Sequence, residues 1–276
     1  MFSVASKGGA SLSALTPTPG SWPATITGKA RRLGRLFDAN GRTLMVAVDH
    51  SLSRGPFGGV ADMRSVLHHA VTGGADAVIT HRGAAVRAMP IQRQTGLIIH
   101  LSAGPALIKG DQRRELACDP ETALSLGADA VSMQVTLGID SRTDRDALGD
   151  LGRVAASCDH LGLPLIVMSY AVASMERRSR GTMHAVRIAA ELGADVVKTR
   201  HPGLQYLSEL VHTAMVPVVI AGGASSEPWS VFLDTVRHTM RSGIAGFCVG
   251  RQVFEHSDPT EATERLREAV HDVHVE

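Results

Sequence analysis

The segment Gly193-Ala194-Asp195-Val196-Val197-Lys198-Thr199 carries the pattern that decides the fold of this chain. It returns in related form as Gly74-Ala75-Asp76-Ala77-Val78-Ile79-Thr80 and as Gly127-Ala128-Asp129-Ala130-Val131-Ser132-Met133. Each copy follows a helix-like stretch and leads into an apolar run rich in β-branched residues. A glycine at this place ends a helix with a positive φ, and a short loop then feeds the next strand. The three copies therefore predict a repeated helix–loop–strand unit.

Similar apolar runs along the whole chain give eight expected strands, at 43–49, 75–81, 96–102, 129–136, 164–170, 195–200, 216–221 and 246–250. Several are apolar at nearly every position, which is typical of parallel strands buried on both faces. Eight such units with amphipathic helices between them predict an α/β fold, a single-domain (β/α)8 or TIM barrel. An open doubly wound sheet is the alternative. No glycine-rich dinucleotide loop follows the first expected strand, which disfavours that alternative.

Composition narrows the function classes. The 276 residues carry a formal net charge of +1 and only 4% aromatic residues, so nothing favours nucleic acid or an anionic membrane surface as a partner. No apolar run approaches the roughly 18 residues of a membrane span. The three cysteines form no CxxC pair and indicate free thiols in a reducing compartment, so we expect a cytoplasmic protein.

The chain divides into two parts. Residues 1–27 are rich in Gly, Ser, Thr and Pro and lack the apolar core of a signal peptide, so we expect a flexible N-terminal tail. Residues 28–276 form the expected barrel domain. Within it, the segment 29–37 precedes the first strand and is expected to be a helix that plugs the bottom of the barrel.

Lys198 is the strongest candidate for a reactive residue. The chain has four lysines against 24 arginines, yet it keeps a lysine inside an expected strand. Arginine cannot lose its proton in a protein, whereas burial can lower the pKa of a lysine from about 10.4 toward neutrality. We therefore expect a lowered pKa at Lys198 and a role as a Schiff-base nucleophile.

In a barrel of this kind the reactive groups gather where the strands end. The expected strands end, in chain order, in Asp49-His50, His81-Arg82, His100 and Ser102, Gln134 and Thr136, Tyr170, Lys198, Gly222-Gly223, and Gly250-Arg251. Asp49 is a candidate for proton transfer, with a structural salt bridge to Arg54 as the alternative. Tyr170 is a candidate proton donor, with a tyrosine at the edge of the core as the alternative.

The loops after the seventh and eighth strands fit a phosphate site. Glycines let backbone N–H groups approach an anion, serines add donors, and an arginine offers a planar fork. The candidates are Gly222, Gly223, Ser225, Gly250 and Arg251. Ordinary loop glycines are the alternative.

Four histidines, at 50, 81, 100 and 201, also lie near strand ends. Together they raise the alternative of a metal site, but none of them shows tight ligand spacing such as HExxH. We expect no metal and no other cofactor, and we assign His50 and His81 to substrate binding.

The segment 28–37 followed by Val46-Ala47-Val48-Asp49-His50 resembles the opening of the class I aldolases grouped with archaeal fructose-bisphosphate aldolase and deoxyribose-phosphate aldolase. Within this group the chain looks most like the 2-amino-3,7-dideoxy-D-threo-hept-6-ulosonate synthases and the related aminohydroxybenzoate-pathway aldolases. Further matching stretches lie at 127–132, 163–165, 193–199, 217–223 and 249–254, and the resemblance covers about residues 28–272.

The resemblance implies a (β/α)8 barrel with a Schiff-base lysine on the sixth strand, at Lys198. It implies a proton-transferring aspartate at Asp49, an acid/base tyrosine at Tyr170 and phosphate held by the last two loops. It also implies a homo-oligomer built from rings or pairs of rings, with a decamer as one such form.

Three positions depart from the family pattern. Ala171-Val172-Ala173 stands where the family usually has Pro-Arg-Gly, His81-Arg82-Gly83 replaces His-Lys-Gly, and Gln134 replaces a histidine. The Schiff-base residues match the family, so the departures concern the expected acceptor pocket.

The expected reaction joins a phosphorylated ketose, dihydroxyacetone phosphate, to an aldehyde, aspartate 4-semialdehyde, and gives a C7 amino sugar phosphate. Fructose-bisphosphate cleavage and thiolase-type acyl transfer from a phosphorylated diketone to coenzyme A are the enzymatic alternatives. A catalytically idle barrel that serves in assembly is a third class.

Overall fold

The computed structural model describes residues 27–56, 58–90, 94–104, 113–172, 178–223 and 227–272. Of the expected N-terminal tail, only Thr27 falls among these residues, as the first residue of a helix. Within the described part, no helix is both long enough and apolar enough to span a bilayer.

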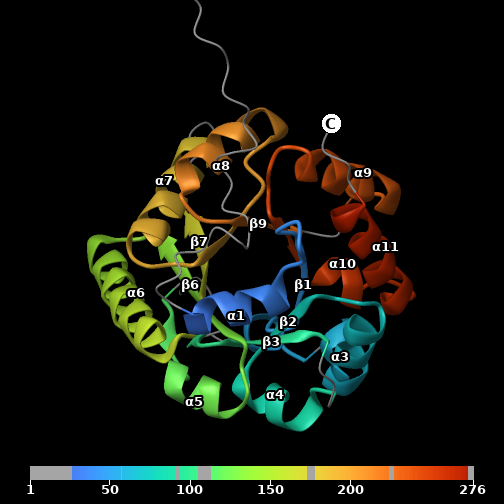
Figure 1. Cartoon of the computed structure of the whole chain (residues 1–276), viewed down its shortest axis with the longest axis horizontal. Helices are drawn as coiled ribbons and strands as arrows, with labels where there is room; N and C mark the ends of the chain where they lie inside the picture. Colours follow the sequence, from blue (N-terminus) through green and yellow to red (C-terminus); the bar gives the residue numbers. More distant parts are fainter. Residues whose placement is uncertain are drawn as a thin grey trace, which may run out of the picture.

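Eight parallel strands of the described chain close into a barrel, which confirms the predicted fold (Figure 1). Around the barrel they follow one another as β1, β2, β3, β6, β7, β8, β9 and β10, and β10 pairs with β1. Their bounds are Thr43–Ala47, Ala77–Thr80, Gly96–His100, Ala130–Leu137, Leu165–Ala171, Val196–Thr199, Val218–Ala221 and Gly246–Val249. The open doubly wound sheet is thereby excluded.

Helices surround the barrel (Figure 1). The longer ones are α3 (Met63–Thr72), α4 (Arg82–Ala88), α5 (Pro120–Ser125), α6 (Ser141–Leu161), α7 (Arg178–Glu191), α8 (Leu207–Ala214), α9 (Trp229–Met240) and α11 (Pro259–His271). Short helical turns are α2 (Ser51–Arg54), η3 (Gly58–Val60), η5 (Leu204–Tyr206) and α10 (Arg251–Phe254). A small antiparallel hairpin, β4 (Ser102–Ala103) with β5 (Glu115–Leu116), follows β3 along the chain.

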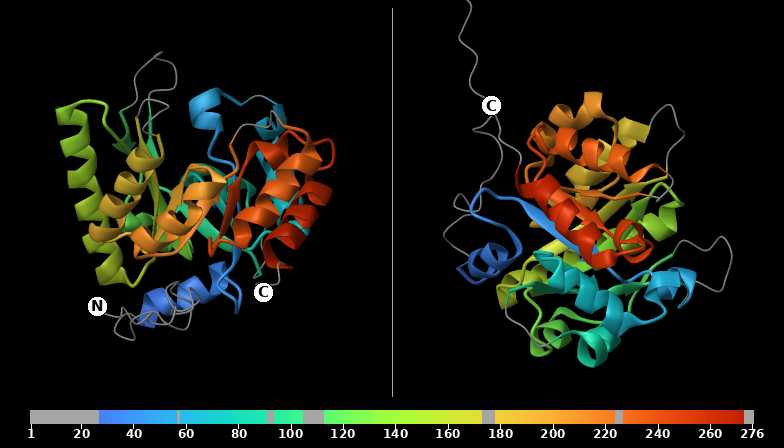
Figure 2. Two further views of the ribbon diagram at one scale, coloured as in Figure 1. Left: turned by 90° about the horizontal axis from the view of Figure 1, so that it is seen from above. Right: turned by 90° about the vertical axis from the view of Figure 1, so that its right-hand side faces the viewer.

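Helix α1 (Thr27–Leu36) plugs one end of the barrel, as the sequence predicts. Figures 1 and 2 show it lying across that end. Its Leu33 and Leu36 are buried together with inward-facing strand residues such as Ile98 and Val219. Residues on the outer face of the strands pack instead against the surrounding helices in a second apolar cluster. The barrel is thus a packed core that is closed at its bottom, so a site can open only at the other end.

The Gly-Ala-Asp repeat explains how the bottom is built. The three glycines have φ values of 81°, 87° and 103°, the left-handed conformation predicted for them. The three aspartates accept hydrogen bonds from backbone N–H groups at the start of the preceding strands, at 2.7, 3.1 and 2.8 Å. Each carboxylate also pairs with a basic side chain: Asp76 with His271, Asp129 with Arg35 and Asp195 with Lys29. One sequence motif therefore ties neighbouring strands to the first and last helices.

Candidate active site

The carboxyl ends of the strands surround a cavity of about 780 Å³. Its lining includes seven of the predicted site residues, His50, Tyr170, Lys198, Gly222, Gly223, Gly250 and Arg251. A smaller adjoining cavity of about 120 Å³ contains Asp49 and His81 and shares Lys198 and Tyr170 with the first. The structure thus brings the predicted residues together, except for Ser225, which lies outside the described residues.

Lys198 projects from β8 into the barrel interior. It pairs in register with Met168 of β7 and Val219 of β9, and it is only 7% exposed. Its Nζ lies 3.9 Å from the Sδ of Met168, a weak acceptor. An amine in this place has little solvent and is held among groups on three neighbouring strands.

The expectation of a lowered pKa at Lys198 is wrong. Burial acts to lower the pKa, but the side chains of Cys248, Tyr170 and Asp49 all favour the ammonium form, and the net shift is upward. The lowered pKa was expected from desolvation and from a nearby positive charge at Arg251, and the sequence could not show which other groups face the amine. The resting lysine is therefore protonated, and it must give up a proton before it can attack a carbonyl.

Asp49 follows β1 and faces Lys198 across the small cavity. Burial raises the pKa of its carboxyl, but His100, Lys198, His50 and His81 act in the other direction, and the net pKa lies below its ordinary value. Its Oδ1 lies 3.3 Å from His50 Nδ1 and its Oδ2 lies 4.0 Å from His100 Nε2. Asp49 is thus an ionised carboxylate beside the amine. The side chain of Arg54, its alternative partner, lies outside the described part of the chain.

His100 was placed near a strand end by the sequence, but its role in the site was missed. It is 3% exposed, its Nδ1 lies 2.8 Å from Ser132 Oγ and its Nε2 lies 3.2 Å from Ser102 Oγ. Burial lowers the pKa of His100 to about 4, so the ring is neutral at physiological pH. The available signal was the register, since His100 pairs with Ser132 on the adjacent strand.

Tyr170 lies near the end of β7, and burial raises the pKa of its phenol although Lys198 and Arg200 act to lower it. The guanidinium of Arg200 lies 5.0 Å from the centre of the Tyr170 ring, a cation–π contact. Arg200 also lines the large cavity. It was missed because it was counted as the last residue of the expected strand 195–200, whereas the observed strand ends at Thr199.

Two of the predicted phosphate-loop glycines lie close against neighbouring groups. A Cβ on Gly250 would lie 2.6 Å from the His50 ring and 2.8 Å from the Ala47 carbonyl oxygen. A Cβ on Gly222 would lie 2.7 Å from Oε1 of Gln252. The Gln252 amide donates to the carbonyls of Gly222 at 2.5 Å and Gly223 at 3.2 Å, so it joins the two loops. No feature of the sequence singled out this buried glutamine.

Comparisons with known proteins agree with this geometry. The sequence pattern of the DeoC/LacD family aldolases matches residues 43–256. A 2-amino-3,7-dideoxy-D-threo-hept-6-ulosonate synthase of Archaeoglobus fulgidus is 36% identical over 253 residues, covering 91% of this chain and 94% of the relative. A 2-amino-4,5-dihydroxy-6-oxo-7-(phosphonooxy)heptanoate synthase of Streptomyces griseus is 32% identical over 249 residues, covering 88% of this chain and 90% of the relative.

A solved structure of a Schiff-base-forming fructose-1,6-bisphosphate aldolase superposes with a TM-score of 0.80 and 30% sequence identity, covering 87% of this chain and 99% of the other. The family pattern spans most of the chain, and two relatives exceed 30% identity over nearly their whole length. The chain therefore belongs to the DeoC/LacD aldolase family.

Proposed function

We propose that this aldolase forms a Schiff base between Lys198 and dihydroxyacetone phosphate, and joins the resulting enamine to aspartate 4-semialdehyde. The product is a C7 amino sugar phosphate, 2-amino-4,5-dihydroxy-6-oxo-7-phosphonooxyheptanoate. One observation carries the proposal: a buried lysine amine and a phenol line two adjoining cavities, of which one contains the Asp49 carboxylate and the other reaches the two glycine loops. The names of the relatives from Archaeoglobus fulgidus and Streptomyces griseus support this substrate class.

The first step is proton loss from the Lys198 ammonium. Asp49 is ionised and faces the amine, so it is the proposed acceptor. The neutral Nζ then attacks the carbonyl carbon of the ketose and forms a carbinolamine. Loss of water, with a proton supplied to the leaving hydroxyl, gives the iminium.

The second step makes and uses the enamine. Removal of a proton from the carbon next to the iminium gives an enamine, whose carbon attacks the aldehyde carbon. Tyr170 donates a proton to the alkoxide that forms, and its neutral phenol is suited to this because burial raises its pKa. Water then hydrolyses the iminium, which releases the product and regenerates Lys198.

The phosphate is assigned to the loops after β9 and β10. The N–H of Gly222 already donates to the Cys248 carbonyl at 3.0 Å. Gly222 therefore serves by its small size, and the proposed donors are the N–H groups of Gly223 and Gly250 and the guanidinium of Arg251. Arginine suits a phosphate because its fork matches two oxygens.

Mass analysis of the products tests the acceptor. Dihydroxyacetone phosphate is supplied together with aspartate 4-semialdehyde and glyceraldehyde 3-phosphate in one mixture. The proposal predicts that the C7 amino sugar phosphate predominates, and a product made up only of fructose 1,6-bisphosphate would contradict it. The resemblance to the fructose-bisphosphate aldolase structure favours that second product as the competing function.

Two further expectations accompany the proposal. The reaction needs no metal, and activity that disappears with a chelator and returns with added divalent metal would overturn this. The chain forms a homo-oligomer in the cytoplasm, and light scattering of the purified protein measures the assembly.

A further inference from the structure

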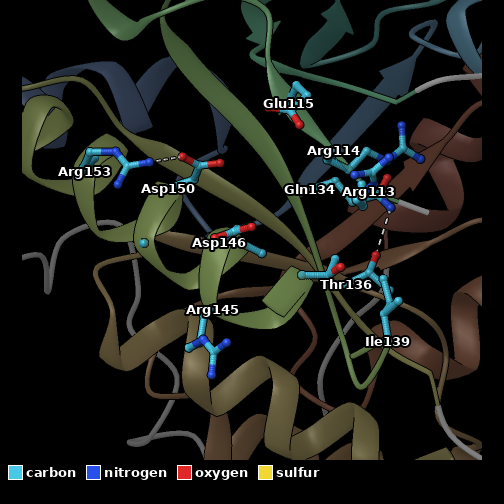
Figure 3. A pocket seen from close by; sticks show the side chains of 13 residues that line it. Arg113, Arg114, Glu115, Gln134, Thr136, Ile139, Arg145, Asp146, Asp150 and Arg153 are labelled. Carbon is cyan, nitrogen blue, oxygen red and sulfur yellow. Dashed lines mark hydrogen bonds and ion pairs between the residues drawn. The ribbon is translucent and has the colours of Figure 1, made fainter. Parts of the chain in front are cut away.

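A third cavity, of about 300 Å³, lies beside the mouth of the barrel (Figure 3). One wall is formed by Arg113, Arg114 and Glu115, at the start of β5 and just before it. A second wall is the end of β6, at Gln134 and Thr136. The third wall is the first half of α6, from Thr143 to Arg153. We call this space the α6 cavity.

The α6 cavity adjoins the catalytic cavities. Gln134 lines the α6 cavity and both cavities that contain Lys198. Arg114 lines the α6 cavity and the small cavity that contains Asp49 and Lys198. A molecule joined to Lys198 would therefore reach the α6 cavity past the side chains of Gln134 and Arg114.

The walls of the α6 cavity carry both signs of charge. The lining includes four arginines and three carboxylates, namely Arg113, Arg114, Arg145, Arg153, Glu115, Asp146 and Asp150. Arg153 and Asp150 pair with each other on α6. Arg114 is half-buried, and no hydrogen bond or ion pair within the described part of the chain engages its guanidinium. The Asp146 carboxylate lies 4.0 Å from the Arg142 guanidinium. This ion pair is weak because both side chains are largely exposed.

This charge pattern suits a ligand group that carries both signs of charge. The arginines of the lining favour an anionic group, and its carboxylates favour a cationic group beside it. An α-amino acid group carries one carboxylate and one ammonium. Its carboxylate can pair with a guanidinium on one wall, and its ammonium can pair with a carboxylate on the other. Figure 3 shows Arg114 beside Gln134 and Asp146 on the α6 side of the same space.

We propose that the α6 cavity binds the α-amino acid end of the acceptor aldehyde, with Arg114 on its carboxylate and Asp146 on its ammonium group. This inference rests on the proposed function, because it assigns a place to the acceptor of that reaction. Gln134 and Thr136, whose side chains are hydrogen-bonded at 3.1 Å, form the floor between the reacting carbon and this end.

The test compares three acceptors with dihydroxyacetone phosphate as donor. Aspartate 4-semialdehyde has both charged groups, succinic semialdehyde lacks the amine, and butanal lacks both. Asp146→Asn should lower the kcat/KM ratio of the amino aldehyde to succinic semialdehyde by about twofold to fivefold, the effect of losing one ion pair at a largely exposed carboxylate. Arg114→Gln should lower the ratio of succinic semialdehyde to butanal to a similar extent.

Arg265→Gln on the exposed face of α11 is the matched control, and it should leave both ratios as in the wild type. Unchanged ratios in both variants of the α6 cavity, with the wild type converting aspartate 4-semialdehyde, would overturn this inference alone. A wild type that does not convert aspartate 4-semialdehyde would overturn the proposed function as well. Borohydride trapping of the donor on Lys198, measured in parallel, reports whether each variant is folded.

Discussion

At the residue scale, the chemistry of the site depends on how Lys198 and Asp49 change each other's pKa. Asp49 favours the ammonium form of Lys198, while Lys198 helps to hold the pKa of Asp49 below its ordinary value. Such a pair keeps the amine protonated at rest and supplies an acceptor when substrate arrives. Asp49 is therefore expected to act on the chemical step more than on substrate affinity.

Asp49→Asn tests this expectation. The amide cannot accept the proton, so kcat should fall by about 10²- to 10⁴-fold, the usual worth of general acid–base catalysis. KM for the donor should change much less. Steady-state kinetics gives both quantities, and a large rise in KM with an unchanged kcat would show that Asp49 only binds substrate.

Arg200→Gln tests the pairing of Arg200 with Tyr170. The arginine acts to lower the pKa of the buried phenol, so its removal should raise that pKa further. If Tyr170 is the proton donor, the alkaline limb of the kcat profile should move to higher pH. Arg237→Gln, on the surface of α9, is the control, and an alkaline limb in the same place in both variants would contradict the assignment.

The sequence predicts the position of a residue well when that residue lies at the end of a regular strand. It predicts poorly when the role of a residue depends on contacts with distant segments of the chain. Lys198, Asp49 and Tyr170 lie at the mouth as predicted, because eight regular strands determine which residues reach it. His100, Arg200 and Gln252 matter through contacts with segments far along the chain. The direction of the Lys198 pKa was missed for the same reason, since it depends on three neighbours from other strands.

At the scale of elements, the loops after β9 and β10 act as one unit. Gly250 lies against the His50 ring and Ala47 carbonyl oxygen, and Gln252 joins the loops by its side-chain amide. The rigid shape of this unit depends on glycine where no Cβ fits. Phosphate binding should therefore be sensitive to the smallest side chain.

Gly250→Ala should raise KM for the phosphorylated donor by about tenfold or more, because the added carbon displaces the loop or His50. Gly34→Ala, on the exposed face of α1 where an added Cβ meets no other atom, is the matched control for glycine replacement within a folded chain. Kinetics with dihydroxyacetone phosphate and with unphosphorylated dihydroxyacetone separates the effects. An equal loss on both donors would contradict a phosphate role.

Regular elements were predicted because their period is visible in the sequence, and the eight barrel strands are the clearest case. The β4–β5 hairpin was not predicted. Each of its strands has two residues, which is too short for a period, and its pairing joins Ser102 to Leu116 across a long connection. The short helical turns α2 and α10 were not predicted either, because they are also too short to show a period. Both belong to the loops that form the site.

At the scale of the whole molecule, charged side chains close the barrel bottom. His271 at the end of α11 bonds to Asp38 and Asp76 at 2.8 and 2.7 Å. Lys29 of α1 bonds to Asp159 and Asp195 at 2.5 and 2.7 Å. These contacts fix the first and last described helices to the bottom of the barrel. The free energy of unfolding should therefore be sensitive to the loss of these contacts.

The His271 contacts predict a pH dependence of stability. Burial lowers the pKa of His271, but its bonds to Asp76 and Asp38 raise it more, so the folded pKa exceeds the unfolded value of about 6.5. The stabilisation is complete below pH about 6.5 and is lost as pH rises through the folded pKa. Wild type should lose its advantage over His271→Gln, roughly 2 kcal/mol at pH 6, in urea titrations toward pH 9. A constant difference across that range would contradict this account.

The central claim is that Lys198 forms a Schiff base with a phosphorylated ketose. The most direct measurement is borohydride reduction in the presence of dihydroxyacetone phosphate, followed by mass analysis of the peptide that contains residue 198. The account predicts one stable adduct on Lys198, and no adduct on that peptide in Lys198→Met. An unmodified Lys198 peptide from enzyme that is turning over would contradict the account.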